Sequence, residues 1–138
     1  MSEIPCYVLD SFAMLAFLEN EPGAERVISL LEEAGQGKCR IDLSLINLGE
    51  VLYITERERG LPKAQEVLAA VEQLPVQVLP ADSEAVFAAA HVKAHCRLSF
   101  ADAFAAAAAQ RCAGVLITGD PEFSAVQSEI RIDWLPKR

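Results

Sequence analysis

The sequence has neither the long apolar run that marks a membrane protein nor the basic and then apolar start that marks a secreted one. Its longest apolar stretches, at 7–18 and 100–109, are each interrupted by an aspartate and fall short of the about 20 residues that a transmembrane helix needs. The opening residues, MSEIPCY, contain no basic segment leading into an apolar one, so no secretory signal is predicted. We therefore expect a cytoplasmic protein that does not contact a membrane.

Paired cysteines are also missing. Four cysteines occur without a CxxC pair, at Cys6, Cys39, Cys96 and Cys112. A chain of 138 residues that is 52% apolar can form a core without disulfides, so we interpret these cysteines as reduced, mostly buried small apolar residues. His91 and His95 share one face of a predicted helix, but no third ligand follows at a recognisable spacing, which argues against a zinc site there.

Basic residues are scarce, with 12 Lys and Arg against 20 Asp and Glu and a net charge of −8. This balance argues against broad nonspecific binding of nucleic acid, because phosphate contacts are made by clustered cations. Any binding of RNA must then rely on a local patch, on metal ions, or on both. The densest basic stretch is RERGLPK, with Arg57, Arg59 and Lys63, for which solvated helix ends around a turn are the favoured explanation and an RNA-binding patch is the alternative.

Short runs of strand-forming residues alternate with helical patterns along the whole chain. Strands are predicted at 6–10, 39–44, 76–79, 114–118 and 130–135, and helices at 11–20, 21–35, 45–59, 62–74, 83–97 and 99–112. This alternation predicts an α/β fold, in which a central parallel sheet of about five strands is sandwiched between helices. We expect residues 1–138 to form a single domain.

Four acids are the only charged residues in otherwise apolar windows: Asp10, Glu50, Asp102 and Asp120. Local structure offers an explanation for three of them. Asp10 can cap the helix that follows it, Asp102 lies three residues after Ser99 as in a capping box, and Asp120 can support a turn. Glu50 lies too far into its helix to be a cap, and its alternative is to extend to the surface.

The predicted topology can also bring these four acids together. Asp10 and Asp120 follow strands, and the carboxyl ends of parallel strands share one edge of a sheet. Glu50 and Asp102 lie early enough on their helices to approach the same edge. Converging carboxylates repel one another unless cations lie between them, and Mg²⁺ or Mn²⁺ suits oxygen ligands. Such ions activate water and stabilise attack on a phosphodiester.

The four acids lie in the segments YVLDSFAMLAFLENEPG, LSLINLGEVLYI, LSFADAFAAAAAQ and VLITGDPEF, which together span nearly the whole chain. These segments, in this order, resemble those of the PIN-domain ribonucleases, and in size and layout the chain is similar to the VapC-type toxins of toxin–antitoxin systems. The resemblance implies a PIN-like fold and a metal-dependent endoribonuclease that hydrolyses phosphodiester bonds of RNA.

The resemblance also implies roles for individual residues. Asp10, Glu50 and Asp102 would hold the principal Mg²⁺ or Mn²⁺, and Asp120 would support a second ion or position the attacking water. Ser11 and Thr118 would orient ligands or water. Glu122 is an additional acid that could compete for the second-metal role.

The implied partners are an RNA substrate, a cognate antitoxin protein and a second copy of the chain. The main alternative is a PIN-like binding or scaffold module without turnover. A haloacid-dehalogenase-type phosphatase is a weaker one, because it would need an aspartate two positions after Asp10, where this chain has Phe12.

Overall fold

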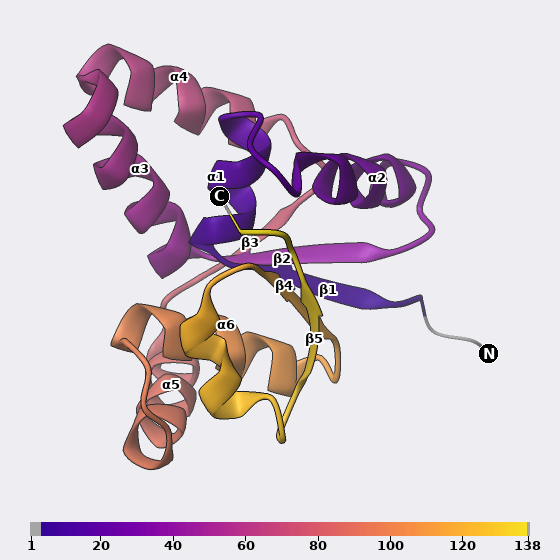
Figure 1. The fold of residues 1–138 in the computed structure, drawn as a ribbon, viewed down its shortest axis with the longest axis vertical. Coiled ribbons are helices and arrows are strands. Elements are labelled where there is room, and N and C mark those ends of the chain that lie inside the picture. The colour runs from indigo at the N-terminus through magenta and orange to yellow at the C-terminus, as the bar shows by residue number, and fades with distance from the viewer. Residues whose placement is uncertain (1–3, 138) are drawn as a thin grey trace.

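Five parallel strands form the centre of the computed structural model, which describes residues 4–137 (Figure 1). In the chain order of the strands these are β1 (Cys6–Leu9), β2 (Arg40–Ser44), β3 (Gln77–Leu79), β4 (Val115–Thr118) and β5 (Arg131–Trp134). In space they lie in the order β3-β2-β1-β4-β5. The prediction that the chain has no secretory signal rests partly on residues 1–3, which lie outside the described part of the chain.

Helices cover both faces of the sheet. One face carries α1 (Ser11–Leu18), α2 (Ala24–Gly35), α3 (Leu45–Arg59) and α4 (Leu61–Glu72), and the other carries α5 (Ser83–His95) and α6 (Phe100–Arg111) (Figure 1). A short 3₁₀ helix, η1 (Pro121–Val126), joins β4 to β5 and was not predicted from the sequence. The α/β sandwich of five parallel strands is thus confirmed.

The alternation of side chains along the strands divides the core into two layers. On β1, Leu9 packs with the α1–α4 layer while Val8 packs with the α5–α6 layer. The alanine run of α6 is buried from Ala103 to Ala109, so the short side chains bring the helix backbone close to the sheet. This close approach carries the start of α6 toward the carboxyl edge of the central strands.

The strand order has a switch point between β1 and β4. The chain moves outward from β1 to β2 and β3, and then crosses back to place β4 beside β1. Open α/β sheets form their sites at such a point, outside the carboxyl ends of the strands. Leu9 is in register with Ile117, so the residues that follow each of them are neighbours at this edge.

The burial of the cysteines differs from the expectation. All four cysteines are free, but only Cys39 is buried, while the other three are half-buried, so the expectation of mostly buried cysteines was wrong. These three lie at element ends rather than in the core. Within residues 4–137, no helix combines the length and the apolar character needed to cross a membrane.

Candidate active site

A cavity of about 340 Å³ lies at the switch point of the sheet. Its walls come from α1, the α1–α2 turn, α3, the start of α6 and the start of η1, and Ser11, Phe12 and Ser99 are among the lining residues. Five carboxylic acids line it: Glu21, Glu50, Asp102, Asp120 and Glu122. Three of the four acids singled out from the sequence therefore share one cavity.

Asp10, the fourth, is buried beside this cavity with only 1% of its surface exposed. One carboxylate oxygen accepts a hydrogen bond from the backbone N–H of Ala13 at 2.9 Å, which caps α1. The other accepts one from the hydroxyl of Thr118 at 2.5 Å. The Thr118 oxygen in turn accepts the backbone N–H of Asp120 at 3.0 Å, which connects the ends of β1 and β4.

Three carboxylates form the tightest group in the cavity. Asp102, Asp120 and Glu122 each offer an oxygen, and these oxygens all lie within 4.8 Å of one another. Asp120 caps η1 by accepting the backbone N–H of Glu122 at 2.9 Å, and the Ser99 hydroxyl caps α6 by accepting the N–H of Asp102 at 3.1 Å. Asp120 and Glu122, the two candidates for the second-metal role, thus lie close enough together for both to take part.

Glu50 is held in place by Asn47, one turn earlier on α3. The amide of Asn47 donates to Glu50 Oε1 at 3.0 Å and to the carbonyl of Ala101 at 3.2 Å, so it joins α3 to α6. Asn47 is fully buried, and its Oδ1 has no hydrogen-bond partner among residues 4–137. The sequence motif contained this residue, but only the structure connects it to the carboxylate.

The crowding of acids changes their protonation. Burial raises the pKa of Asp10 to about 7, with Asp102 and Asp120 adding repulsion, while the hydrogen bonds from Thr118 and Ala13 act in the opposite direction. Burial also raises the pKa of Asp102 to about 7, followed by repulsion from Asp120, Glu122 and Glu50 and offset in part by Ser99. Without a cation, the cavity therefore retains protons near neutral pH.

This donor set fits a hard divalent cation. All the clustered ligands are carboxylate oxygens, which Mg²⁺ and Mn²⁺ prefer, and a cation among them would offset the repulsion that adds to burial in raising the pKa of Asp10 and Asp102. Asp10, Asp102 and Asp120 each lie at or within the first turn of a helix, where the helix dipole favours negative charge. Capping and cation binding are compatible uses of the Asp10 and Asp120 side chains, which cap α1 and η1.

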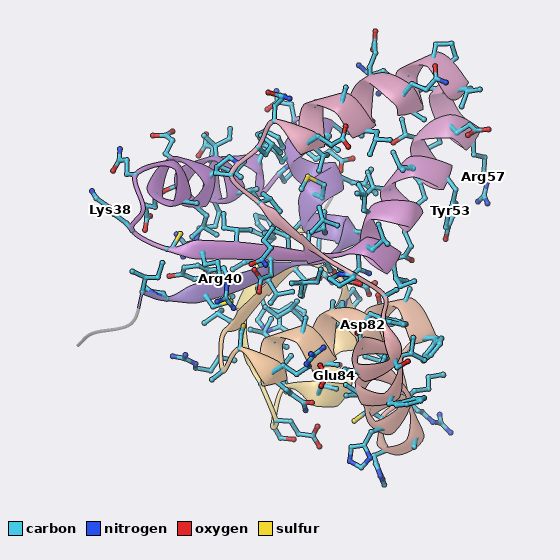
Figure 2. The ribbon with its side chains drawn as sticks, turned by 180° about the vertical axis from the view of Figure 1, so that it is seen from behind. Lys38, Arg40, Tyr53, Arg57, Asp82 and Glu84 are labelled. Carbon is cyan, nitrogen blue, oxygen red and sulfur yellow. The ribbon has the colours of Figure 1, made fainter. Side chains whose placement is uncertain are left out.

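The predicted basic residues lie at the α3–α4 turn, outside the cavity walls. Arg59 forms an ion pair with Glu19 at 2.7 Å, and Lys63 forms one with Glu66 at 3.5 Å. Arg57 stacks over the ring of Tyr53 at 5.2 Å, on the outer surface of α3 (Figure 2). Tyr53, which is 50% exposed, was not identified from the sequence.

Comparisons with solved structures agree with this architecture. A chain of VapBC2 from Rickettsia felis, bound to a DNA fragment from its promoter, superposes with a TM-score of 0.75 at 15% identity, covering 95% of this chain and 99% of that one. For DNA-bound VapBC from Salmonella typhimurium the TM-score is 0.74 at 21% identity, with coverages of 94% and 98%. VapC20 of Mycobacterium tuberculosis, a toxin that cleaves the sarcin-ricin loop, gives 0.71 at 17% identity, with coverages of 94% and 99%.

These likenesses, at 15 to 21% identity, establish the fold. No curated protein matches the sequence. The model of the family described as the PIN domain matches residues 7–129, which is most of the 138-residue chain. The chain belongs to the PIN-domain family.

Proposed function

We propose that this protein is a metal-dependent endoribonuclease and the toxin of a VapBC-type pair, acting in the cytoplasm. The observation that carries the proposal is the convergence of Asp102, Asp120 and Glu122 within 4.8 Å, beside buried Asp10, at the switch point of the sheet. A scaffold gains no stability from acids placed so that they repel one another. A hydrolase needs them to hold cations.

The proposed ligands for Mg²⁺ or Mn²⁺ are Asp10, Glu50, Asp102 and Asp120, with Glu122 joining Asp120 in support of a second ion. When bound, such ions supply Lewis-acid activation of water and neutralise charge on a phosphodiester. Asp10 acts from beneath the cavity, where the Thr118 hydroxyl and the Ala13 N–H fix both of its oxygens. We propose direct contact for Asp102, Asp120 and Glu122, whose oxygens are grouped in the cavity.

Neighbouring residues would position these ligands. Asn47 fixes the direction of Glu50 and ties it to α6 through the Ala101 carbonyl. Thr118 connects Asp10 to the backbone of Asp120. Ser11 lines the cavity next to Asp10 and is placed to hydrogen-bond a ligand or a water molecule. These contacts make the group of acids more rigid than helix ends alone would.

For RNA, we propose binding that combines the cations in the cavity with the basic residues of the α3–α4 turn. Arg57 and Tyr53 present a guanidinium group and an aromatic ring side by side at the surface, a combination that can stack on an unpaired base. Arg59 and Lys63 would contribute charge after exchanging their acidic partners for phosphate.

A cognate antitoxin and a second copy of the chain are the proposed protein partners. The similar structures include VapBC complexes, which supports the antitoxin. Large apolar side chains are exposed on several helices, Leu45, Phe87 and Phe100 among them, and exposed apolar area of this kind favours protein contacts. Copurification with the product of a neighbouring small gene tests the first partner, and light scattering of the purified chain tests the second.

The decisive experiment is cleavage of a mixed pool of structured RNAs by the purified protein in Mn²⁺, in Mg²⁺ and in EDTA. The test variants are Asp10→Asn and Asp102→Asn, which keep side-chain size and remove a ligand charge. Asp82→Asn is the matched control, because Asp82 caps α5 through Ala85 as Asp10 caps α1, but lies outside the cavity.

We expect metal-dependent cleavage by the parent and by Asp82→Asn, and at least a hundred-fold loss in the two site variants. If the folded parent never cuts RNA in either metal and the site variants bind Mn²⁺ as it does, the protein is a PIN-like binding module instead. If expression of the protein arrests growth and the arrest depends on Asp102, the protein is a toxin as well as a nuclease. RNA cleavage without growth arrest would support the nuclease assignment and exclude the toxin assignment.

A further inference from the structure

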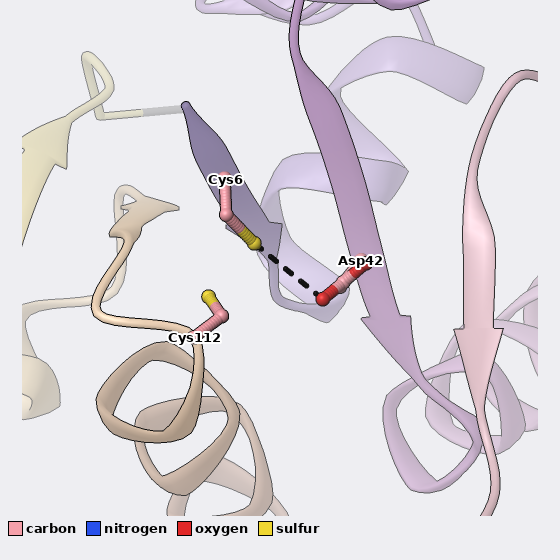
Figure 3. Close-up of side chains that lie close together, drawn as sticks. All are labelled: Cys6, Asp42 and Cys112. Atoms are coloured by element: carbon pink, nitrogen blue, oxygen red, sulfur yellow. Dashed lines mark hydrogen bonds between the residues drawn. The ribbon is translucent and has the colours of Figure 1, made fainter. Parts of the chain in front are cut away.

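A second group of metal-ligating side chains lies at the opposite edge of the sheet. Cys6 begins β1, Asp42 lies on β2, and Cys112 directly follows α6 (Figure 3). On β1, Cys6 precedes Asp10 by four residues, which is about 13 Å along the strand, so the sulfur atoms lie toward the end of the sheet away from the acidic cavity. The two groups share no residue.

The three side chains converge to within the size of a coordination shell. The two sulfur atoms and a carboxylate oxygen of Asp42 all lie within 4.8 Å of one another. The Cys6 thiol donates to Asp42 Oδ2 at 3.5 Å, which is about the sulfur–oxygen separation that two ligands of a tetrahedral zinc ion have. The sulfur atoms of such a site lie about 3.8 Å apart, so small side-chain rotations complete it.

Gly114 makes this approach possible. A Cβ atom at this position would lie 2.7 Å from Cys112 Sγ and 2.3 Å from the carbonyl oxygen of Cys6. Both distances are below any van der Waals contact, so a side chain there would drive Cys112 away from β1. The turn between α6 and β4 therefore has the one residue type that lets the two cysteines meet.

Arg40 balances the charge of the group. Its guanidinium donates to Asp42 at 3.1 and 3.2 Å and to Cys6 Sγ at 3.3 Å. Two thiolates and one carboxylate around a divalent ion leave a single negative charge, which one guanidinium neutralises. Hydrogen bonds of this kind to bound thiolate and carboxylate are typical of the groups that orient metal ligands.

An open cavity next to the three side chains leaves room for a fourth ligand of a tetrahedral ion. It has a volume of about 240 Å³ and is lined by Arg40, Asp42, Asp82, Arg111 and Cys112 among others. A cation entering there would reach Asp42 and Cys112 directly, with space for water or an exogenous ligand. Asp42 is 2% exposed, so it is already removed from bulk water and oriented toward the sulfur atoms.

We propose that Cys6, Asp42 and Cys112 form a binding site for a thiophilic divalent cation, with zinc as the natural occupant. The ligand set of two thiolates and one carboxylate suits zinc and disfavours Mg²⁺, which separates this site chemically from the acidic cavity. The ion would join the start of β1, the middle of β2 and the end of α6. Its role is structural, with an exchangeable fourth ligand.

Binding at this site must displace protons. In the metal-free protein, burial raises the pKa of Cys6, and Cys112 and Asp42 add to the effect while Arg40 opposes it. Zinc replaces the thiol protons of Cys6 and Cys112, so up to two protons pass to the buffer for each ion bound. Affinity should therefore increase with pH.

The test uses the full chain, freed of metal with EDTA, reduced with a phosphine and titrated with Co²⁺ as a spectroscopic probe. Thiolate ligands give a near-ultraviolet charge-transfer band, and tetrahedral geometry gives visible d–d bands. We expect both to saturate at one Co²⁺ per chain and to disappear when Zn²⁺ is added. Zinc should also raise the melting temperature, which chelator would reverse.

Variants assign the signal to residues. Cys6→Ser and Cys112→Ser should lose the charge-transfer band, while Cys96→Ser keeps it, because Cys96 lies outside the group. Asp102→Asn should keep it as well, which separates this site from the acidic cavity. Arg40→Gln should weaken the affinity about 10- to 100-fold.

Two results would overturn the proposal. One is the absence of a charge-transfer band in folded parent protein whose four thiols are shown by titration to be reduced. The other is an unchanged band in Cys112→Ser. If that band is absent and Cys6 and Cys112 form a disulfide when the reductant is removed, the two cysteines are a redox pair and not a zinc site.

Discussion

Replacing Asp10 with asparagine should stabilise the metal-free protein above neutral pH while removing its nuclease activity. Asp10 is fully buried, and its pKa in the folded protein is about 7 instead of 3.8. An acid with a raised pKa keeps its proton longer in the folded state than in the unfolded state. The folded state therefore loses stability as pH increases from about 4 to about 7.

The size of this loss follows from the two pKa values. They differ by about three pH units, and at about 1.4 kcal/mol per unit the ionised carboxylate costs about 4 kcal/mol of stability above pH 7. Asparagine is neutral and its oxygen can still accept the Ala13 N–H that caps α1. Because the amide is itself desolvated on burial, we expect a net gain of about 2 to 4 kcal/mol at pH 8.

Urea denaturation in EDTA at pH 4 and at pH 8 measures this effect. The gain in the free energy of unfolding should be small at pH 4, where the parent carboxyl is protonated, and largest at pH 8. Asp82→Asn measures the contribution of capping alone, since Asp82 accepts the Ala85 N–H at the same 2.9 Å. Saturating Mn²⁺ should reverse the order, because the parent gains binding energy that the variant cannot.

A difference between Asp10→Asn and the parent that does not change from pH 4 to pH 8 would refute this reasoning. A variant less stable than the parent at pH 8 in EDTA would do so too. Either result would mean that the hydrogen bonds from Thr118 and Ala13 outweigh the desolvation of the carboxylate. Asp10 would then be a structural cap whose charge the fold stabilises by itself.

Three further predictions concern the residues around the acids. Asn47→Ala should lower Mn²⁺ affinity about 10- to 100-fold by releasing Glu50, measured by calorimetry, and an unchanged affinity would contradict the positioning role. Gly119→Ala should lower the free energy of unfolding, measured by thermal denaturation, by about 1 to 3 kcal/mol, because the alanine Cβ would lie 2.3 Å from the ring of Phe12. Thr118→Val removes a hydrogen bond that lowers the pKa of the buried carboxyl at the end of β1. The free energy of unfolding of the variant should therefore keep falling to a higher pH than that of the parent. A fall whose midpoint lies at the same pH as in the parent, or at a lower one, would contradict this.

Most of the secondary structure could be read from local pattern. Asp10, Ser44, Asp82 and Ser99 cap the helices that follow them, and Gly60 ends α3, because these residue types satisfy the free backbone groups of helix ends. The 3₁₀ helix η1 is the exception. It depends on Asp120 accepting the Glu122 N–H and on burial of Phe123, which no periodicity over so short a segment reveals.

By itself the sequence determined which acids are exceptional. An isolated carboxylate in an apolar window is costly to bury without a partner, so the windows around Asp10, Glu50 and Asp102 already indicated a special use. It also determined the parallel sheet, since strands that alternate with helices leave little other choice. These inferences need only local spacing and the cost of burying charge.

Only the tertiary structure decided which side chains meet. The return of the chain to place β4 beside β1 puts Thr118 against Asp10, and η1 brings Glu122 to Asp102 and Asp120. The same packing brings Cys112 to Cys6, which are far apart in sequence. The physical reason is that such contacts depend on strand order and on the closeness with which α6 packs, which are properties of the whole core and not of any one segment.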